Sequence, residues 1–185
     1  MPGYSQTLAS CHSAGAAVTG TGITSLLHGS ALFTLPGGSL NEGDELEISA
    51  SGQMNTVVTT PGTTIFTFKM GSVAAFVSQA IALNIVAQTN AWWDLVLKMA
   101  VRSVGNGTLA TLITTGSFTS RASLGAPAVA TTNGVGVVGL PDTAPAAGTG
   151  FDSTVSNLID LQVTNSVAGS ITCMRYKLKH EMWRP

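Results

Sequence analysis

Four acidic side chains, Glu42, Asp44, Glu45 and Glu47, fall within six consecutive positions. Carboxylate oxygens at such close spacing are the ligands that Ca²⁺ takes in proteins. The spacing is not that of an EF-hand loop, and the alternation around it puts Glu45 and Glu47 on the solvent side of a strand. We therefore interpret the cluster as the solvated start of a strand.

The other residue types that bind metals are scattered. Neither His-x-x-x-His nor Cys-x-x-Cys occurs, and the three histidines, His12, His28 and His180, lie far apart in the sequence. We predict no metal site and no cofactor. Cys11 and Cys173 are too few for a disulfide framework and fit a reducing cytoplasm, although a bridge between them stays open.

Motifs for catalysis are weak as well. Residues 134–139 satisfy the pattern Gly-x-Gly-x-x-Gly, which binds pyrophosphate only where a strand meets a helix. Pro141 and Pro145 follow, so no helix begins there, and we interpret the segment as a flexible loop. No Gly-x-Ser-x-Gly occurs. The sequence favours a protein that is not an enzyme, while a pair of carboxylates of the glycosidase kind stays open because its spacing is spatial.

Trp92 is the aromatic residue most suited to recognition. It precedes the segment 93–104, in which apolar and polar residues alternate with Trp93 in the apolar set. Trp92 therefore falls on the opposite face of the strand. There it either packs in a second layer or is exposed, where it would stack on a sugar ring or anchor a protein interface. Packing or subunit contact is the favoured interpretation.

Charged residues are scarce in this chain. Asp, Glu, Lys and Arg make up 9% of its 185 residues, whereas soluble domains average about 25%. Because the net charge is −1, no strong field attracts nucleic acid or an anionic membrane, and we predict neither as a partner. The apolar content of 44% is too high for a disordered chain. Much of the surface is expected to be covered by other proteins.

The elements that position these residues are predicted to be strands. Alternation of apolar and polar residues marks 44–48, 64–70 and 93–104. Asn106-Gly107 predicts a hairpin that returns the chain over 109–118. A second hairpin is predicted between 158–164 and 172–182, with Ile159, Leu161 and Val163 facing Met174, Tyr176 and Leu178. We predict an all-β fold: an antiparallel, two-sheet β-sandwich of the jelly-roll type.

The chain is expected to divide into two parts. Residues 1–25 are rich in Gly, Ala, Ser and Thr without periodicity, and they predict an extended N-terminal arm. Residues 26–185 form the β-sandwich domain, with a long loop at about 122–150 that is rich in Gly, Ala, Pro and Thr.

Several segments together resemble a family of bacteriophage virion proteins. They are 26–29, the strand motif Gly-Asp-x-Leu-x-Ile-x-Ala-x-Gly at 43–52, 93–105 with 116–118, and 152–161 with 170–172. The family consists of small trimeric jelly-roll modules, found as head decoration proteins and as tips of tail fibres. These motifs are structural, and the family pattern carries no catalytic residue onto this chain.

The resemblance implies a structural role. The expected function is a homotrimeric capsid decoration, or cement, protein that binds the outer head surface, contacts the major capsid protein and bridges capsomers. Its location would be the outer surface of the virion, after synthesis in the host cytoplasm. The alternative is a tail-fibre or receptor-binding protein that contacts a host surface glycan.

Five residues are candidates for partner binding. Tyr4, Leu8, Val18 and Ile23 are the apolar residues that would anchor the N-terminal arm on the capsid, and Trp92 is the exposed aromatic residue of the domain.

Overall fold

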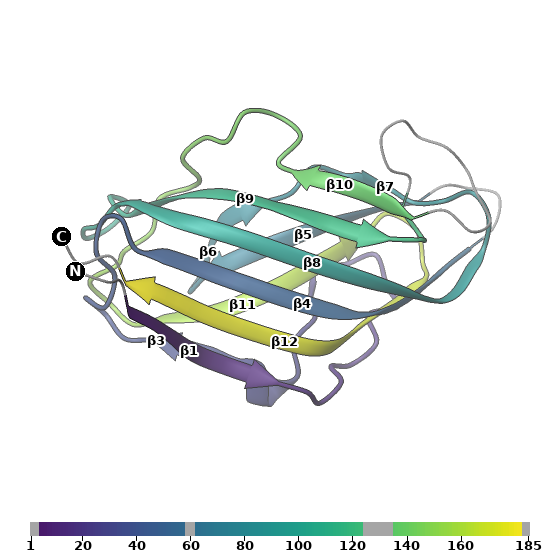
Figure 1. Cartoon of the computed structure of the whole chain (residues 1–185), viewed down its shortest axis with the longest axis horizontal. Helices are drawn as coiled ribbons and strands as arrows, with labels where there is room; N and C mark the ends of the chain where they lie inside the picture. Colours follow the sequence, from purple (N-terminus) through teal and green to yellow (C-terminus); the bar gives the residue numbers. More distant parts are fainter. Residues whose placement is uncertain (1–3, 58–61, 124–134, 183–185) are drawn as a thin grey trace.

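The chain folds into two antiparallel β-sheets packed face to face, as the alternation of apolar and polar residues along its strands predicts (Figure 1). The computed structural model describes residues 4–57, 62–123 and 135–182. The front sheet of Figure 1 contains, in spatial order, β1 (Tyr4–Cys11), β12 (Ser170–Met182), β4 (Glu45–Thr56), β8 (Gln88–Ser103), β9 (Thr111–Ser120) and β10 (Gly136–Leu140). The predicted all-β sandwich is confirmed.

The back sheet is built from shorter strands. It contains β2 (Thr24–Ser25), β11 (Asn157–Asn165), β5 (Thr63–Met70) and β6 (Val73–Val77), in that order. Two further short strands join it, since β3 (Phe33–Leu35) pairs with β11 and β7 (Ile81–Ala82) pairs with β5. A single 3₁₀ turn, η1 (Gly29–Ala31), lies between β2 and β3.

The core lies between the sheets, where alternate residues of every long strand point inward. Many core side chains of both sheets are fully buried, with 0% of their surface exposed. In the front sheet they include Leu46, Ile48, Leu95, Leu97 and Met99, and in the back sheet Phe66, Phe68, Met70, Ile159, Leu161 and Val163. The alternation read from the sequence therefore identifies the buried face of each of these strands correctly.

Three aromatic rings connect the two sheets. Phe66 of β5 lies 6.1 Å from Trp93 of β8 and 5.1 Å from Phe118 of β9, measured between ring centroids. The indole of Trp93 packs under Gly52 of β4, and its Nε1–H donates a hydrogen bond of 3.2 Å to the carbonyl oxygen of Gln53. A large side chain that buries its polar atom with a partner contributes strongly to a core.

The first predicted hairpin is confirmed. β8 and β9 pair antiparallel through the connection around Gly107, which has φ +65°. The return strand begins and ends two residues later than the predicted 109–118.

The second predicted hairpin is wrong, because β11 and β12 belong to opposite sheets. β11 pairs with β5 in the back sheet, whereas β12 pairs with β1 and β4 in the front sheet. Alternation reports which residues face the core and does not report which strand supplies the hydrogen bonds. The two strands therefore lie in different layers of the sandwich.

Met174 is also misplaced by simple alternation. A β-bulge between Cys173 and Arg175 shifts the register of β12 against β4. Cys173 and Tyr176 consequently both point inward, and Met174 is 47% exposed. One extra residue in a bulge reverses the faces of the residues on either side of it.

The segment predicted as an arm is extended but is not detached from the domain. Residues 4–11 form β1, which pairs antiparallel with β12 at the edge of the front sheet. Val18 forms a bridge with Ile171, and Thr24 and Ser25 pair with β11. The first four residues of β1 are exposed, so its sequence lacks the alternation that reveals a half-buried strand.

The predicted loop at 122–150 contains a strand. Gly136–Leu140, part of the glycine motif interpreted as a loop, forms β10 along the free edge of β9, and Gly134 lies outside the described residues. The chain then leaves the sheet as the green loop beyond β10 in Figure 1. It returns to β9 through bridges between Ile113 and Ala147 and between Ala110 and Phe151.

Gly52→Ala tests the packing of the aromatic cluster. A Cβ at this position would overlap the carbonyl oxygen of Thr172 and lie 3.0 Å from Cζ2 of Trp93. We expect a loss of about 1–3 kcal/mol in the free energy of unfolding, the usual effect of overpacking a core. Urea denaturation measures it. Gly139→Ala is the matched control, because nothing lies within 4 Å of a Cβ there; equal stability of the two variants would contradict the packing described.

Candidate functional site

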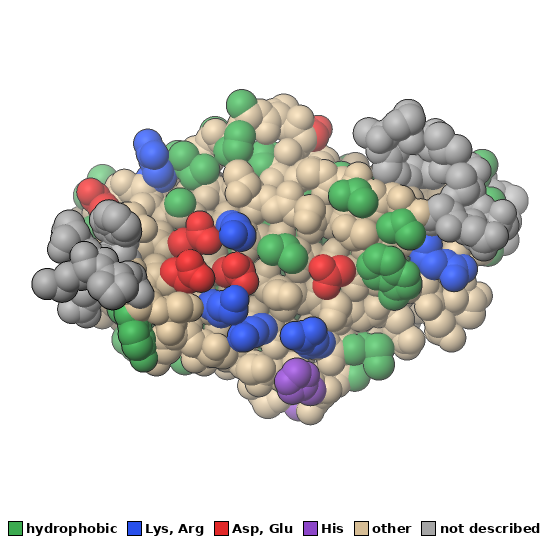
Figure 2. All heavy atoms as spheres, viewed as in Figure 1, with side chains coloured by type: hydrophobic (Ala, Val, Ile, Leu, Met, Phe, Trp, Pro, Cys, Tyr) green, Lys and Arg blue, Asp and Glu red, His purple; other side chains and the backbone are tan. Residues whose placement is uncertain are grey.

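Figure 2 shows the outer face of the front sheet, where hydrophobic side chains are exposed among polar and charged ones. Trp92 and Met174 are 45% and 47% exposed. They border a shallow hollow of about 500 Å³, whose other lining residues are Ser51, Gly52, Trp93, Asp94 and Thr119. We call these seven residues the Trp92 hollow. The predicted outward orientation of Trp92 is confirmed.

The strand register places the residues of the hollow in two neighbouring rows. In one row, Asp94 of β8 lies between Ser51 of β4 and Thr119 of β9. In the next row, Trp92 is paired with Gln53 of β4. Partners on neighbouring strands are separated by about 5 Å and residues two apart on one strand by about 7 Å. An indole, a carboxylate and two hydroxyls therefore share one small area.

The other half of this face carries most of its charge, as the adjoining red and blue side chains in Figure 2 show. Glu47 lies between two lysines: its Oε1 is 3.0 Å from Nζ of Lys179, and its Oε2 is 4.0 Å from Nζ of Lys98. All three side chains point to solvent, and such exposed pairs contribute little to stability. Glu47 is therefore part of the charged outer face of the sheet, where it lies between two lysines.

The acidic cluster also contains one buried member. Asp44 is 0% exposed, and its Oδ2 accepts a 2.9 Å hydrogen bond from Nε2 of His180 and another from the backbone N–H of Asn41. The structure gives His180 no second side-chain hydrogen bond among the residues it describes. The pair connects the turn before β4 with the end of β12, and we interpret it as a structural tie.

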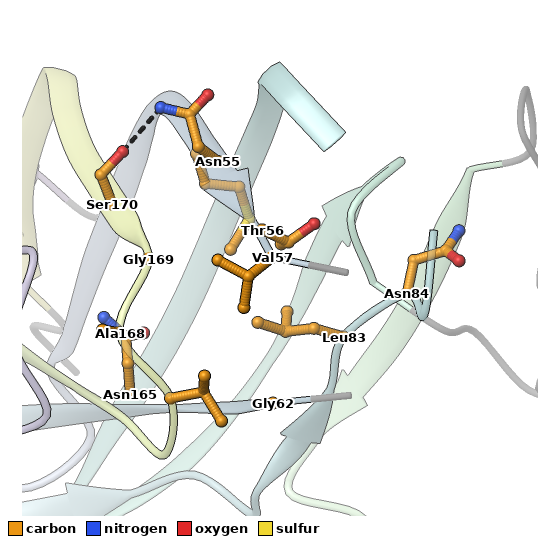
Figure 3. A pocket seen from close by; sticks show the side chains of 12 residues that line it. Asn55, Thr56, Val57, Gly62, Leu83, Asn84, Asn165, Ala168, Gly169 and Ser170 are labelled. Carbon is orange, nitrogen blue, oxygen red and sulfur yellow. Dashed lines mark hydrogen bonds between the residues drawn. The ribbon is translucent and has the colours of Figure 1, made fainter. Parts of the chain in front are cut away.

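A cavity at one end of the sandwich lies between the end of β4, the β11–β12 connection and residues 83–84 (Figure 3). Asn55 and Ser170 close one side through a 2.7 Å hydrogen bond. The cavity has a volume of about 20 Å³, which holds about one water molecule. It is too small for an organic ligand.

A cleft on the side of the sandwich is larger. It lies between β6 and the loop after β10, has a volume of about 260 Å³ and is lined mainly by alanine, valine, threonine and proline side chains. The hydroxyl of Thr114, one of its lining residues, has no hydrogen-bond partner and is itself inaccessible to solvent. A ligand in the cleft would not reach that hydroxyl.

The remaining predicted site residues are not brought together. Tyr4 and Ile23 are 60% and 59% exposed, but Tyr4 begins β1 opposite Met182, whereas Ile23 precedes β2, which pairs with the middle of β11. Leu8 is partly buried against the core. Val18, predicted as an apolar anchor on the capsid, is 3% exposed and belongs to the core of this domain. Its bridge to Ile171 explains the burial.

Two members of the hollow were missed by sequence reasoning. Asp94 shares a strand face with Trp92 because the two are separated by one residue, and that signal was available in the sequence. Met174 gave no such signal, since only the bulge in β12 turns it outward.

The described part of the chain contains no group of three or more His, Cys, Asp or Glu residues arranged to hold a metal ion. Within the same residues, no helix has the length and apolar character needed to cross a membrane. No family model matches the chain, and no curated protein matches it. The function is therefore inferred from the residues themselves.

Both cysteines are buried and free. The thiol of Cys173 donates to the carbonyl oxygen of Arg175 at 3.2 Å. Burial raises the pKa of the Cys173 thiol to about 11. Burial also raises the pKa of Tyr176 above its ordinary range, and its hydroxyl has no hydrogen-bond partner. Both groups favour the neutral form in the folded state.

Stability is expected to fall in alkaline solution. An unfolded thiol loses its proton near a pKa of about 8.5, whereas Cys173 retains it until about pH 11. The unfolded state therefore binds fewer protons in this window, and the free energy of unfolding should fall by about 3 kcal/mol as the pH rises from 8.5 to 11. Tyr176 adds to the fall above its ordinary pKa of 10.

Urea denaturation at a series of pH values measures this dependence. Cys173→Ala should flatten the part of the fall that begins near pH 8.5. Cys11→Ala is the matched control, because the pKa of Cys11 is lowered, chiefly by its hydrogen bond with Ser30. Parallel curves for Cys173→Ala and the unchanged protein would refute the assignment.

Proposed function

We propose that this chain is a structural virion protein that decorates a bacteriophage head. It acts as a homotrimer on the outer surface of the shell, contacts the major capsid protein and bridges adjacent capsomers. The proposal rests chiefly on the surface, where large apolar side chains are exposed and charges are few.

Exposed apolar side chains occur on several faces of the sandwich. Besides Trp92 and Met174, they include Tyr4 and Ile23 of the N-terminal segment, Val135 and Val137 at β10, and Val77 and Leu158 of the back sheet. The chain has eight basic and nine acidic residues for a surface of 8593 Å², and one of the acidic residues, Asp44, is buried. Such a surface gains about 1.5–3 kcal/mol for each large apolar side chain that a partner covers fully.

The strand pairing supports a jelly roll, the fold that the resemblance implies. The pairs are nested: β1 with β12, β3 with β11, β4 with β8 and β5 with β6. This is the pairing that arises when one long antiparallel hairpin is rolled into two sheets. β9 and β10 would then be additions to the edge of the front sheet.

Trimeric assembly multiplies weak contacts. A trimer that sits at a junction between capsomers engages three equivalent sites, so each contact after the first is made at a high effective concentration. Tyr4 and Ile23 remain candidate contacts in this proposal, because both are exposed. Single substitutions there are preferable to removal of residues 1–25, which would delete β1 from the front sheet.

The trimer is tested by the mass of the purified protein. Sedimentation equilibrium at micromolar concentration should give three times the 18.8 kDa mass of the chain. A mass equal to one chain at all concentrations would contradict the trimer and leave the apolar surface without its proposed cover.

The location is tested by the copy number in purified virions. Quantitative mass spectrometry should find this protein at a number comparable to that of the major capsid protein, because a cement protein occupies sites over the whole lattice. A number that is a small multiple of the single tail would instead support the fibre or receptor-binding alternative. Absence from the virion would refute both.

A further inference from the structure

Trp92 occupies an outward-facing position of β8 at which the fold does not need a tryptophan. Burial of Trp93 forces residue 92 onto the outer face of β8, but any polar side chain would satisfy that position. The indole of Trp92 is instead held at the rim of a hollow and remains 45% exposed. Trp92 and Met174 are exposed on the same hollow, and an exposed apolar patch is typical of an interaction site.

Hydrogen-bonding side chains lie near this indole, together with the apolar side chain of Met174. Gln53 is its partner on β4, and Asp94 lies two residues along β8 on the same face. Ser51 and Thr119 lie on either side of Asp94 in its cross-strand row. Arg175 is the partner of Ser51 on β12. The indole therefore shares the hollow with one exposed apolar side chain, Met174, and with hydrogen-bonding side chains that a purely apolar contact would not need.

The carboxylate of Asp94 is available to a ligand. It is half-buried, and no ion pair or side-chain hydrogen bond to it is found within residues 4–57, 62–123 and 135–182. An ionised carboxylate only accepts hydrogen bonds, whereas the Ser51 and Thr119 hydroxyls both donate and accept. A ligand that matches this set carries several hydroxyl groups at about 3 Å spacing and one flat apolar face.

We propose that the Trp92 hollow binds a neutral saccharide. One pyranose ring lies with its C–H groups on the face of the Trp92 indole, whose π-system carries negative charge density. Two neighbouring hydroxyls of the sugar donate to the Asp94 carboxylate, and Ser51 and Thr119 bond further hydroxyls. The volume of about 500 Å³ fits one or two sugar units.

The proposed decoration function also uses the exposure of Trp92 and Met174, but the saccharide site is tested separately from it. Saccharide binding by the purified chain is measured without virions, and neither trimer formation nor capsid binding enters the result. Failure of one proposal therefore leaves the other intact.

The experiment is a titration of the ¹⁵N-labelled protein with N,N′-diacetylchitobiose, lactose and maltose, accompanied by a glycan array that extends the choice of sugars. The indole N–H of Trp92 should shift on binding. The indole N–H of Trp93 is the internal reference, because it donates inward to Gln53. For the best disaccharide we expect a dissociation constant of about 1 mM, which corresponds to about −4.1 kcal/mol.

Substitutions identify the contributions. Trp92→Ala should raise the dissociation constant at least about tenfold, which corresponds to about 1.4 kcal/mol. Asp94→Asn should weaken binding while leaving the thermal unfolding midpoint unchanged, since the carboxylate has no ion pair or side-chain hydrogen bond within the described residues. Tyr4→Ala is the matched control: it removes another exposed aromatic residue and should leave binding unchanged.

Three results would overturn the proposal. The first is that no sugar in the titration or on the array binds the folded protein. The second is that binding survives in Trp92→Ala. The third is that sugars fail to bind while Trp92→Ala changes the sedimentation mass, which would make the hollow a contact between protein chains.

Discussion

The two sheets are packed together mainly through side chains, and the aromatic contacts of Phe66 with Trp93 and Phe118 are part of that packing. Backbone hydrogen bonds join strands within each sheet, and their ladders do not cross the core. Trp93 contacts Phe66 of the opposite sheet and lies beneath Gly52, the residue whose missing side chain makes room for the indole. The position of one sheet over the other therefore depends on this indole.

The burial of Trp93 also determines which residues of β8 point to the outer face of the sheet. Because faces alternate along β8, burial of Trp93 directs both Trp92 and Asp94 outward. A shift of one residue in the pairing of β8 would bury these two and expose Trp93, Leu95 and Leu97. The hollow is consequently as well defined as the core beneath it, and its indole and carboxylate are held on a rigid strand between two paired neighbours.

The sequence predicts which residues are buried more reliably than it predicts which strands pair with each other. Alternation in β4, β5, β8 and β11 gives the buried residues directly, and Asn106-Gly107 gives the hairpin between β8 and β9. The sheet to which a strand belongs is a long-range property, and for this reason β11 and β12 were paired wrongly. β1 was missed because an edge strand with an exposed start has no apolar alternation.

The site was predictable only in part, for the same reason. Trp92 and Asp94 belong to one strand, so their common face follows from their separation in sequence. Ser51 and Thr119 come from two other strands, and their positions beside Asp94 depend on register. Met174 depends on a bulge that a single sequence does not mark. Local sequence patterns thus predict that Trp92 and Asp94 share a face. The positions of Ser51, Thr119 and Met174 beside them can be known only from the three-dimensional structure.

Several of the few charges of this protein are paired within the chain. Glu47 is shared between Lys98 and Lys179, Asp44 is buried against His180, and the Arg121 guanidinium bonds the Gln88 amide. A surface of this kind gives little long-range attraction, since paired exposed charges are screened beyond about 10 Å at 0.1 M salt. Recognition must therefore come from short-range contact. An exposed indole on a rigid sheet, with the Asp94 carboxylate and two hydroxyls at fixed positions near it, meets that requirement at short range.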